Sequence, residues 1–284
     1  MTSPAASLAA SPAVVGIIPA RYGSSRFEGK PLALIEGRPM IEWVARRAAR
    51  APGVSRVIVA LDDDRVAAAC QAAGVEWMMT SSTHGTSTER LAEVAGKVPA
   101  DLYIAINGDE PLIDPNLIAR VIPEGWPRQG GETWPADRPF AANLTCRMTS
   151  PAEVVDPSNI KVVWGPGNQG TGNQELAGVG ADIRRGGRAV FFSRSPIPYP
   201  KSSLDFDYYK HIGVIAYNRA GLDFFAATPK GPIETVEDIN ELRFIENGVM
   251  LQMIVVEPGL GLSVDTPKDL ERIRALVREK ALQP

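Results

Sequence analysis

Apolar residues recur along the chain in short continuous runs, and each run is followed by a polar or Gly-rich segment. In the first third of the chain the runs lie at 14–20, 57–61, 76–80 and 102–106. Continuous apolar runs of this length are typical of strands that are buried on both faces. Between these runs, as at 39–50, 64–73 and 88–98, apolar residues recur at helical spacing. The alternation therefore predicts an α/β fold with a mainly parallel sheet and helices on both faces.

The pattern changes after residue 122. The segments 123–139 and 165–187 are rich in Gly and Pro, and we expect them to form long loops. Further strands are expected at 140–146, 160–164, 189–192, 213–217 and 251–256, and further helices at 221–226, 236–246 and 267–280. We expect residues 14–284 to form one domain after a disordered Ala-, Ser- and Pro-rich tail at 1–13.

Composition and charge exclude several classes of protein. The chain has 30 Lys and Arg against 33 Asp and Glu, a net charge of −3, whereas a general nucleic-acid-binding protein is normally basic. Cys70 and Cys146 are far apart and have no Cys or His neighbours at metal-ligand spacing, which excludes a zinc module and favours a reducing compartment. No apolar run approaches the roughly 18 residues that span a membrane, and the first residues lack the features of a signal peptide.

The loop that follows the strand at 14–20 is the first candidate site, because ligands of open α/β sheets bind beyond the carboxyl ends of the strands. Gly23 and Gly29 permit a tight turn that points backbone N–H groups at an anion. Arg21, Arg26 and Lys30 add three cations, a combination that suits a triphosphate. The spacing departs from the Walker A pattern and from G-x-G-x-x-G, so a nicotinamide dehydrogenase is disfavoured.

Two aspartates are candidates for a metal site. Asp109 follows a predicted strand, and the helix after it already has an N-cap in Asp114. Asp265 precedes the last helix, for which Thr266 and Asp269 are the expected N-cap and N3 residues. Two such carboxylates would suit Mg²⁺ together with phosphate oxygens. An isolated strand-end aspartate is also often structural, so the pattern alone leaves both interpretations open.

Two further polar runs are expected to cap helices. The three aspartates at 62–64 end a predicted strand and precede an Ala-rich helix. The run 86–91 is expected to begin a helix that is capped by Ser87 or Thr88. A nucleotide-sugar glycosyltransferase often carries Asp-x-Asp at a strand end, and 62–64 is the local candidate for that alternative.

Seven segments together resemble the family of 3-deoxy-manno-octulosonate (Kdo) cytidylyltransferases, also called CMP-Kdo synthetases. They are PARYGSSRFEGKPL, STERLAE, NGDEPLI, NIKVV, FFSRSPIPY, HIGVIAY and VDTPKDLER. The resemblance runs from about 14 to 274, with insertions in the two Gly-rich stretches. It implies a nucleotidyltransferase-type, Rossmann-like α/β domain with a smaller antiparallel region. It also implies CTP and a small acidic acceptor as substrates, Mg²⁺ as cofactor, and a cytoplasmic homodimer.

The resemblance also assigns roles by position. Within the domain, 14–122 would bind the nucleotide, about 140–250 would bind the acceptor and form the dimer, and 251–280 would close the fold. The expected catalytic residues are Arg21, Lys30, Asp109 and Asp265, of which Asp109 and Asp265 would hold the metal. The expected nucleotide-binding residues are Ala20, Arg21, Gly23, Ser24, Lys30, Thr80, Ser87, Arg90, Asn107 and Asp109. The expected acceptor-binding residues are Arg194, His211, Asn240 and Glu241.

Departures from the family pattern gather at positions associated with the acceptor. The family usually has Gln at Asn107, Ser-Gly at Thr86-Ser87, Tyr at Ile215 and Glu-Gln at Asn240-Glu241. A site built to hydrogen-bond one polyol discriminates strongly against another. We therefore expect transfer from CTP to Kdo or a related 2-keto-3-deoxy acid. The alternatives are another acid such as a phosphonate, another nucleotide base, a glycosyltransferase, or a nucleotide-binding module without turnover.

Overall fold

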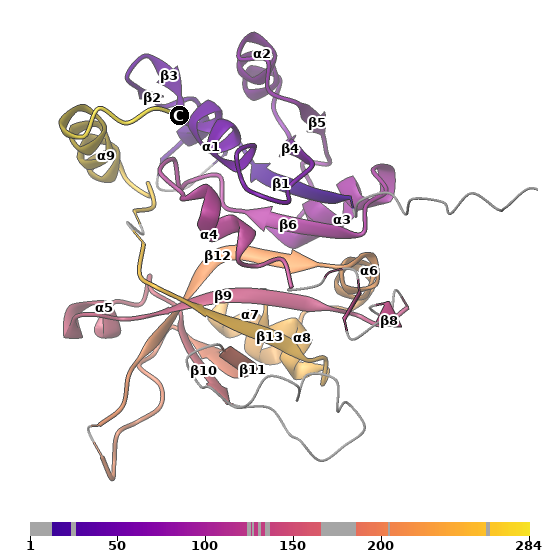
Figure 1. Ribbon diagram of the computed structural model, residues 1–284, viewed down its shortest axis with the longest axis vertical. Coiled ribbons are helices and arrows are strands. Elements are labelled where there is room, and N and C mark those ends of the chain that lie inside the picture. Colours follow the sequence, from indigo (N-terminus) through magenta and orange to yellow (C-terminus); the bar gives the residue numbers. More distant parts are fainter. Residues whose placement is uncertain are drawn as a thin grey trace, which may run out of the picture.

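A single nine-stranded sheet forms the centre of the molecule (Figure 1). The structure, a computed structural model, describes residues 13–23, 27–123, 126, 128–129, 132–133, 137–165, 186–203, 205–259 and 262–284. The strands, in spatial order, are β10 (Lys161–Gly165), β11 (Gly186–Ser193), β13 (Leu251–Val256), β9 (Ala141–Arg147), β12 (Tyr209–Tyr217), β6 (Leu102–Ile106), β1 (Val14–Ala20), β4 (Arg56–Leu61) and β5 (Trp77–Met79). Two small ladders pair β2 (Leu34–Ile35) with β3 (Arg38–Pro39), and β7 (Arg128–Gln129) with β8 (Glu132–Thr133).

The direction of the strands differs between the two parts of the sheet. β5, β4, β1 and β6 are parallel, and a helix leads from each to the next, as parallel neighbours require. β12 is antiparallel to both β6 and β9, and β10 and β11 also pair in antiparallel fashion, while β13 runs parallel to β9. The expected α/β class is confirmed, but the sheet is mixed rather than mainly parallel. The antiparallel strands continue the same sheet because β12 covers the otherwise unpaired edge of β6.

Helices cover both faces of the sheet, as the continuous apolar strands predict. They are α1 (Met40–Ala48), α2 (Asp64–Ala72), α3 (Ser87–Lys97), α4 (Pro115–Ala119), α5 (Pro151–Val155), α6 (Arg219–Ala227), α7 (Pro232–Glu237), α8 (Leu242–Glu246) and α9 (Pro267–Glu279), with a 3₁₀ turn η1 (Lys30–Leu32). Side chains of α1, α2 and α4 share one core with Ile18, whereas α3, α6 and α8 share the opposite core with Ile17. Successive residues of β1 therefore enter different cores, as the alternation of a strand requires.

Several sequence predictions of the elements agree with the structure. The strands at 14–20, 102–106 and 251–256 have the expected bounds, and other elements differ by a few residues at their ends. The single helix expected at 236–246 is wrong, because the chain forms α7 and α8 with Asp238 between them. Asp238 has a φ of 52°, in the left-handed region, which ends α7.

The segment 165–187 lies largely outside the described residues, as do about half of 123–139 and the whole tail at 1–12. In the described part of 123–139, β7 and β8 form a short ladder where we expected only loop. The segment 165–187 contributes its ends to β10 and β11. The division of the chain into functional parts stays a prediction.

The last helix, α9, packs beside α1 and so carries the chain back to the carboxyl ends of the first strands. Its residues Leu270, Ile273 and Val277 share a core with Ile35 and Trp43. Because this contact is apolar and extensive, it anchors the segment that precedes α9 close to the loop after β6.

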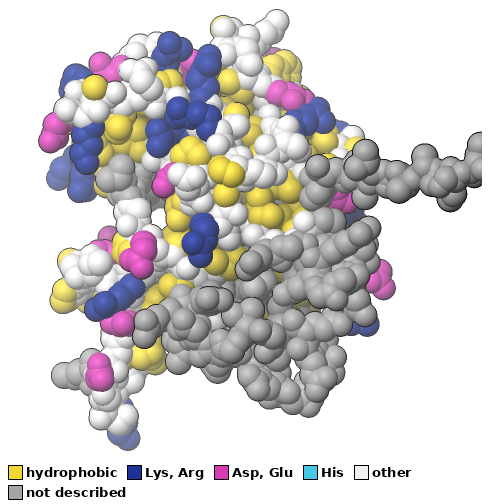
Figure 2. All heavy atoms as spheres, viewed as in Figure 1, with side chains coloured by type: hydrophobic (Ala, Val, Ile, Leu, Met, Phe, Trp, Pro, Cys, Tyr) yellow, Lys and Arg dark blue, Asp and Glu magenta, His cyan; other side chains and the backbone are white. Residues whose placement is uncertain are grey.

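Basic side chains gather on the upper part of the face drawn in Figure 2, where Figure 1 shows α9 and the β2–β3 ladder. In this region Arg278 pairs with Glu36 at 3.2 Å and Arg274 pairs with Glu271 at 2.6 Å. Part of this basic charge is thus balanced locally. No helix in the described part of the chain is long and apolar enough to cross a membrane.

Candidate active site

Three charged side chains from distant segments meet beyond the carboxyl ends of β1 and β6. The Nζ atom of Lys30 lies 3.0 Å from Oδ2 of Asp109 and 3.5 Å from Oδ1 of Asp265. The two acidic segments are joined by a backbone hydrogen bond of 2.8 Å from the Val264 N–H to the carbonyl of Asp109. The structure therefore brings together three of the four residues expected to be catalytic.

The two carboxylates fit a divalent cation. Oδ1 of Asp109 is buried and has no hydrogen-bond partner among the described residues, which leaves an acceptor for a ligand. No group of three or more His, Cys, Asp or Glu side chains with metal-binding geometry occurs within the described ranges. Mg²⁺ needs no such group, because it takes one or two carboxylates and completes its shell with substrate oxygens and water.

The loop that carries Lys30 is fastened at both ends. The Gly29 N–H donates to the carbonyl of Tyr22 at 3.0 Å, and Gly29 has a φ of 69°, which favours glycine. The Tyr22 N–H donates to Oδ1 of Asp62 at 3.2 Å, and the Arg65 guanidinium lies 3.4 Å from the centroid of the Tyr22 ring. Lys30 begins η1 directly after this turn, so its side chain is directed toward the strand ends.

The other residues expected in this loop are only partly described. Arg21 and Gly23 are exposed just beyond β1, and Ala20 is its buried last residue. Ser24 and Arg26 lie outside the described residues. Their expected contact with the triphosphate stays a prediction.

Thr80 and Arg90 form part of a buried network beneath the strand ends. Arg90 is only 4% exposed, and its guanidinium pairs with Oδ2 of Asp62 at 2.7 Å and donates to the Thr80 hydroxyl. The Thr80 hydroxyl in turn donates to the carbonyl of Leu61. The cap of α2 is Asp63, within the run where the sequence predicts one, whereas Asp62 ties β1, β4 and α3 together. Arg90 and Thr80 therefore help to position the loop of Tyr22, and their expected contact with the nucleotide stays a prediction.

The loop after β6 passes so close to β1 that glycine is required at position 108. A Cβ atom on Gly108 would lie 2.9 Å from the carbonyl oxygen of Pro19. On the other side, the Asn107 N–H donates to the carbonyl of Gly213 at 3.1 Å, and the Asn107 side chain lies against Gly213. The loop that carries Asp109 is thus held between β1 and β12.

His211 is held in one orientation on β12. Asn143 donates its amide N–H groups to the carbonyls of Ile212 and Val214, so its Oδ1 faces Nδ1 of His211 at 2.9 Å and accepts its hydrogen. Burial lowers the pKa of His211, the Glu241 carboxylate raises it, and a neighbouring arginine lowers it again. The imidazole is therefore neutral near pH 7, and among the described residues no group bonds to Nε2.

Arg194 lies beside His211 and is fixed by backbone groups. Its guanidinium donates to the carbonyls of Glu237 at 2.8 Å, Pro157 at 3.1 Å and Asp238 at 3.2 Å. Its own carbonyl accepts a hydrogen bond of 2.7 Å from Lys161 Nζ, a fully buried ammonium that also donates to two other carbonyls. Sequence analysis gave Lys161 no role, although it lies in the quoted segment NIKVV.

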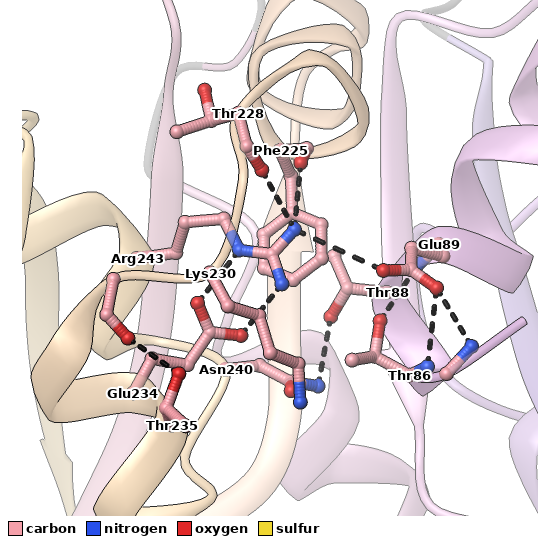
Figure 3. A network of polar contacts seen from close by, with 12 residues as sticks. Thr86, Thr88, Glu89, Phe225, Thr228, Lys230, Glu234, Thr235, Asn240 and Arg243 are labelled. Carbon is pink, nitrogen blue, oxygen red and sulfur yellow. Dashed lines mark hydrogen bonds and ion pairs between the residues drawn. The ribbon is translucent and has the colours of Figure 1, made fainter.

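Figure 3 shows how α3 is joined to α7 and α8. The Asn240 amide donates to the hydroxyls of Ser87 and Thr88, both at 3.3 Å. Arg243, which is 2% exposed, forms two hydrogen bonds of 2.7 and 2.6 Å with the fully buried Glu234. Its Nη1 atom lies 3.9 Å from Oε1 of Glu89 on α3. Ser87, which is expected to bind the nucleotide, thus contacts Asn240, which is expected to bind the acceptor.

The N-cap of α3 is Thr86, so the expected cap by Ser87 or Thr88 is wrong. The Thr86 hydroxyl accepts from the Glu89 N–H, and the Glu89 side chain accepts from the Thr86 N–H, which completes a capping box. The signal was present in the sequence as Thr-x-x-Glu. Because Thr86 serves as the cap, Thr88 and the exposed Ser87 can contact Asn240.

The chain is similar over most of its length to known cytidylyltransferases. A family model described as cytidylyltransferase matches residues 15–254. A 3-deoxy-manno-octulosonate cytidylyltransferase from Escherichia coli is 40% identical over 264 residues, which cover 93% of this chain and 96% of the relative. An 8-amino-3,8-dideoxy-manno-octulosonate cytidylyltransferase from Shewanella baltica is 38% identical over 259 residues, which cover 90% of this chain and 95% of that relative.

Solved structures show the same fold. The structure of a CMP:2-keto-3-deoxy-manno-octonic acid synthetase complexed with CTP superposes with a TM-score of 0.79 at 38% identity. It covers 94% of this chain and 99% of the other. A cytidylyltransferase from Leptospira borgpetersenii is 15% identical with a TM-score of 0.56, covers 94% of this chain and 87% of the other, and supports the fold alone.

Proposed function

Because the chain belongs to the cytidylyltransferase family, we propose that it couples CTP to Kdo or a related 3-deoxy sugar acid. The products are the CMP-sugar and pyrophosphate. The observation that carries this proposal is the convergence of Lys30, Asp109 and Asp265 at the ends of β1 and β6. The relatives named for this reaction match nearly the whole chain, and the solved neighbour contains CTP.

The residues at the strand ends have distinct tasks in such a transfer. A hydroxyl of the acceptor attacks the α-phosphorus in line with the departing pyrophosphate, and the protein chiefly provides position and charge. Lys30 and Arg21 neutralise the negative charge on the leaving pyrophosphate. Asp109 and Asp265 hold Mg²⁺, which when bound neutralises phosphate charge and lowers the pKa of the attacking hydroxyl.

The acceptor lies between these residues and the group around His211. The loop that carries Asp109 touches Gly213, two residues beyond His211 on β12, so the two groups are neighbours. Arg194 supplies positive charge for the carboxylate of the acid, and Nε2 of neutral His211 accepts a hydrogen bond from a sugar hydroxyl. Asn240 connects this side of the site to the start of α3.

We also propose that the protein is a cytoplasmic homodimer. Both described cysteines are free and buried, which suits a reducing compartment. Val190 on β11 is 55% exposed, and Tyr199 and Phe206 beyond it are 85% and 44% exposed, a set of apolar groups that suits a protein interface. Sedimentation equilibrium measures the mass directly, and a monomer at micromolar concentration would exclude the dimer.

Purified protein with CTP, Kdo and Mg²⁺ should form CMP-Kdo and release pyrophosphate. The product should vanish when EDTA removes the cation and return when Mg²⁺ is added in excess, because without the cation the two carboxylates repel the negative triphosphate instead of neutralising it. Mass spectrometry identifies the product, and a coupled assay measures pyrophosphate. The same assay with UTP, ATP and GTP tests which nucleotide base the protein accepts, and a phosphonate acceptor tests which acid it accepts. Binding of CTP without turnover, or sugar transfer without pyrophosphate, would contradict the proposal.

Gly108→Ala should lower kcat/KM by about 100-fold and also lower the melting temperature, while the fold is retained. The new Cβ atom collides with the Pro19 carbonyl at 2.9 Å, so the loop must move and carry Asp109 with it. Misplacement by about 1 Å can cost that much in rate. Gly96→Ala on α3 is the matched control, since no atom lies within 4 Å of its Cβ position. Equal rates for the two variants would show that the close approach does not position Asp109.

A further inference from the structure

Asn143 on β9 lies opposite an irregular part of β12. The register of β12 against β9 shifts between His211 and Ile215, so that three residues of β12 face one residue of β9. Such a bulge disrupts the backbone ladder locally. The Asn143 amide donates to two carbonyls of the bulge, those of Ile212 at 2.8 Å and Val214 at 3.2 Å. The side chain therefore supplies hydrogen bonds that hold the bulge in place beside His211.

These contacts fix the orientation of the Asn143 amide. A carbonyl oxygen accepts hydrogen bonds and cannot donate them, so the NH₂ group must face Ile212 and Val214. The amide oxygen then faces Nδ1 of His211 at 2.9 Å, where it requires a hydrogen on that nitrogen. Asn143 is fully buried, so water does not compete for these contacts. A residue of the neighbouring strand thus imposes the Nδ1–H tautomer on His211.

The ring plane and the backbone of His211 are held as well. The fully buried ring of Phe192 on β11 packs edge to face with the imidazole, with the ring centroids 6.3 Å apart. The His211 N–H donates to the carbonyl of Ile160 at 2.9 Å. With ring and tautomer fixed, Nε2 is a pre-oriented acceptor to which no residue in the described part of the chain is bonded. A ligand group at this point must donate a hydrogen bond.

The surroundings of His211 keep the imidazole neutral. Burial has the largest effect and lowers the pKa of His211, Glu241 raises that pKa, and Arg194 lowers it again. Lys210 precedes His211 on β12 and so points to the opposite face of the strand, where it pairs with Glu153 at 2.9 Å. Nε2 therefore keeps its lone pair near pH 7.

We propose that Asn143 is a positioning residue that holds His211 in the Nδ1–H tautomer, so that Nε2 accepts a hydrogen bond from a hydroxyl of the sugar acid. The inference rests on the proposed function and concerns a residue to which sequence analysis gave no role. Because Asn143 is fully buried, it acts through His211. The site thereby selects a substrate that presents a donor at this point and rejects an ether or carboxylate oxygen, which can only accept.

Nitrogen NMR reads the tautomer directly. The chain has two histidines, His84 and His211, so a His211→Gln variant assigns the ring signals of nitrogen-15-labelled protein. The unchanged protein should carry the hydrogen on Nδ1 of His211 at pH 7. Asn143→Leu removes the acceptor at similar size and should populate the Nε2–H form. Thr145→Val is the matched control, because the fully buried Thr145 on β9 donates to the Lys210 carbonyl at 2.8 Å and not to the imidazole.

Kinetics with CTP, Mg²⁺ and Kdo as the probe test the effect on the substrate. Asn143→Leu should raise the KM for Kdo by about tenfold, which corresponds to one hydrogen bond, and change kcat less. Asn143→Asp keeps an oxygen for the Nδ1 hydrogen but adds a negative charge that raises the pKa of His211. Its KM should therefore rise as the pH falls through that raised pKa. The KM of the unchanged protein should change little from pH 8 down to about 6.5, the usual pKa of histidine.

The outcomes separate the inference from the function on which it rests. A hydrogen that moves to Nε2 in Asn143→Leu but not in Thr145→Val, together with a raised KM, supports both. An Nε2–H tautomer in the unchanged protein overturns the inference whether or not the variants fold. A merely structural role would lower kcat and the melting temperature of Asn143→Leu with the tautomer unchanged, which also overturns it. The Nδ1–H tautomer without pyrophosphate from CTP and Kdo refutes the proposed function and the substrate contact, while the hold of Asn143 on His211 stands.

Discussion

Asp109→Asn and Asp265→Asn should each lower kcat by about a thousandfold, with the fold retained. Each substitution replaces a negative oxygen ligand by a neutral amide and weakens a cation site worth several kcal/mol to the transition state, and about 1.4 kcal/mol corresponds to a tenfold change in rate. Both side chains are partly exposed, at 25% and 28%, so neither is needed to fill the core. Pyrophosphate release at saturating CTP and increasing Mg²⁺ measures the effect.

The control is Asp114→Asn, in the same part of the chain. Asp114 caps α4, and asparagine caps helices as well as aspartate does, so rate and stability should stay near those of the unchanged protein. If the two proposed metal ligands act as a unit, the double variant Asp109→Asn with Asp265→Asn should be little slower than either single one. An Asp265→Asn variant with unchanged Mg²⁺ dependence would remove Asp265 from the site.

Arg243→Ala should lower the free energy of unfolding by about 3 to 5 kcal/mol, because it leaves the carboxylate of Glu234 buried without a partner. Arg243 is 2% exposed and Glu234 is fully buried, so solvent does not screen the pair. For a chain of this size we expect the melting temperature to fall by roughly 10 °C. Urea denaturation and thermal melting measure the two quantities.

Arg56→Ala provides the comparison with an exposed ion pair. Arg56 and Glu76 are 45% and 46% exposed, and such a pair contributes about 1 kcal/mol or less. A double variant, Arg243→Met with Glu234→Leu, should recover much of the stability lost in Arg243→Ala, because no buried charge remains unpaired. If Arg243→Ala melts at the same temperature as the unchanged protein, the pair does not hold α7 and α8 together.

Local hydrogen bonds made the helix starts predictable. Asp114 with Pro115, and Thr266 with Asp269, begin α4 and α9 as the sequence indicates, since each cap bonds to a backbone group within three residues. The same logic applies to α3, where Thr86 and Glu89 form the capping box and the expectation of Ser87 or Thr88 was misplaced by one or two residues. These features are encoded within one turn of chain and need no tertiary context.

Partner choice over long distances could not be predicted in this way. The structure buries Arg90, an expected nucleotide-binding residue, against Asp62, 28 positions away along the chain, and the spacing in the sequence did not indicate this contact. Arg243 and Glu234 lie on separate short helices, and nothing in their spacing distinguishes a buried pair from two exposed charges. The direction of β12 is similarly undetermined by its apolar pattern, because a buried strand has the same alternation in either orientation.

The sequence alone therefore determined the buried strands, most helix ends and the identity of the charged residues at the strand ends, because these depend on neighbours a few positions apart. The tertiary structure decided which of those charges meet: Lys30 with Asp109 and Asp265 beyond β1 and β6, and Arg90 with Asp62 beneath them. It also left Oδ1 of Asp109 buried without a hydrogen-bond partner among the described residues. Packing of α9 and the continuation of the sheet through β12 bring these segments together, and those contacts depend on the whole chain being folded.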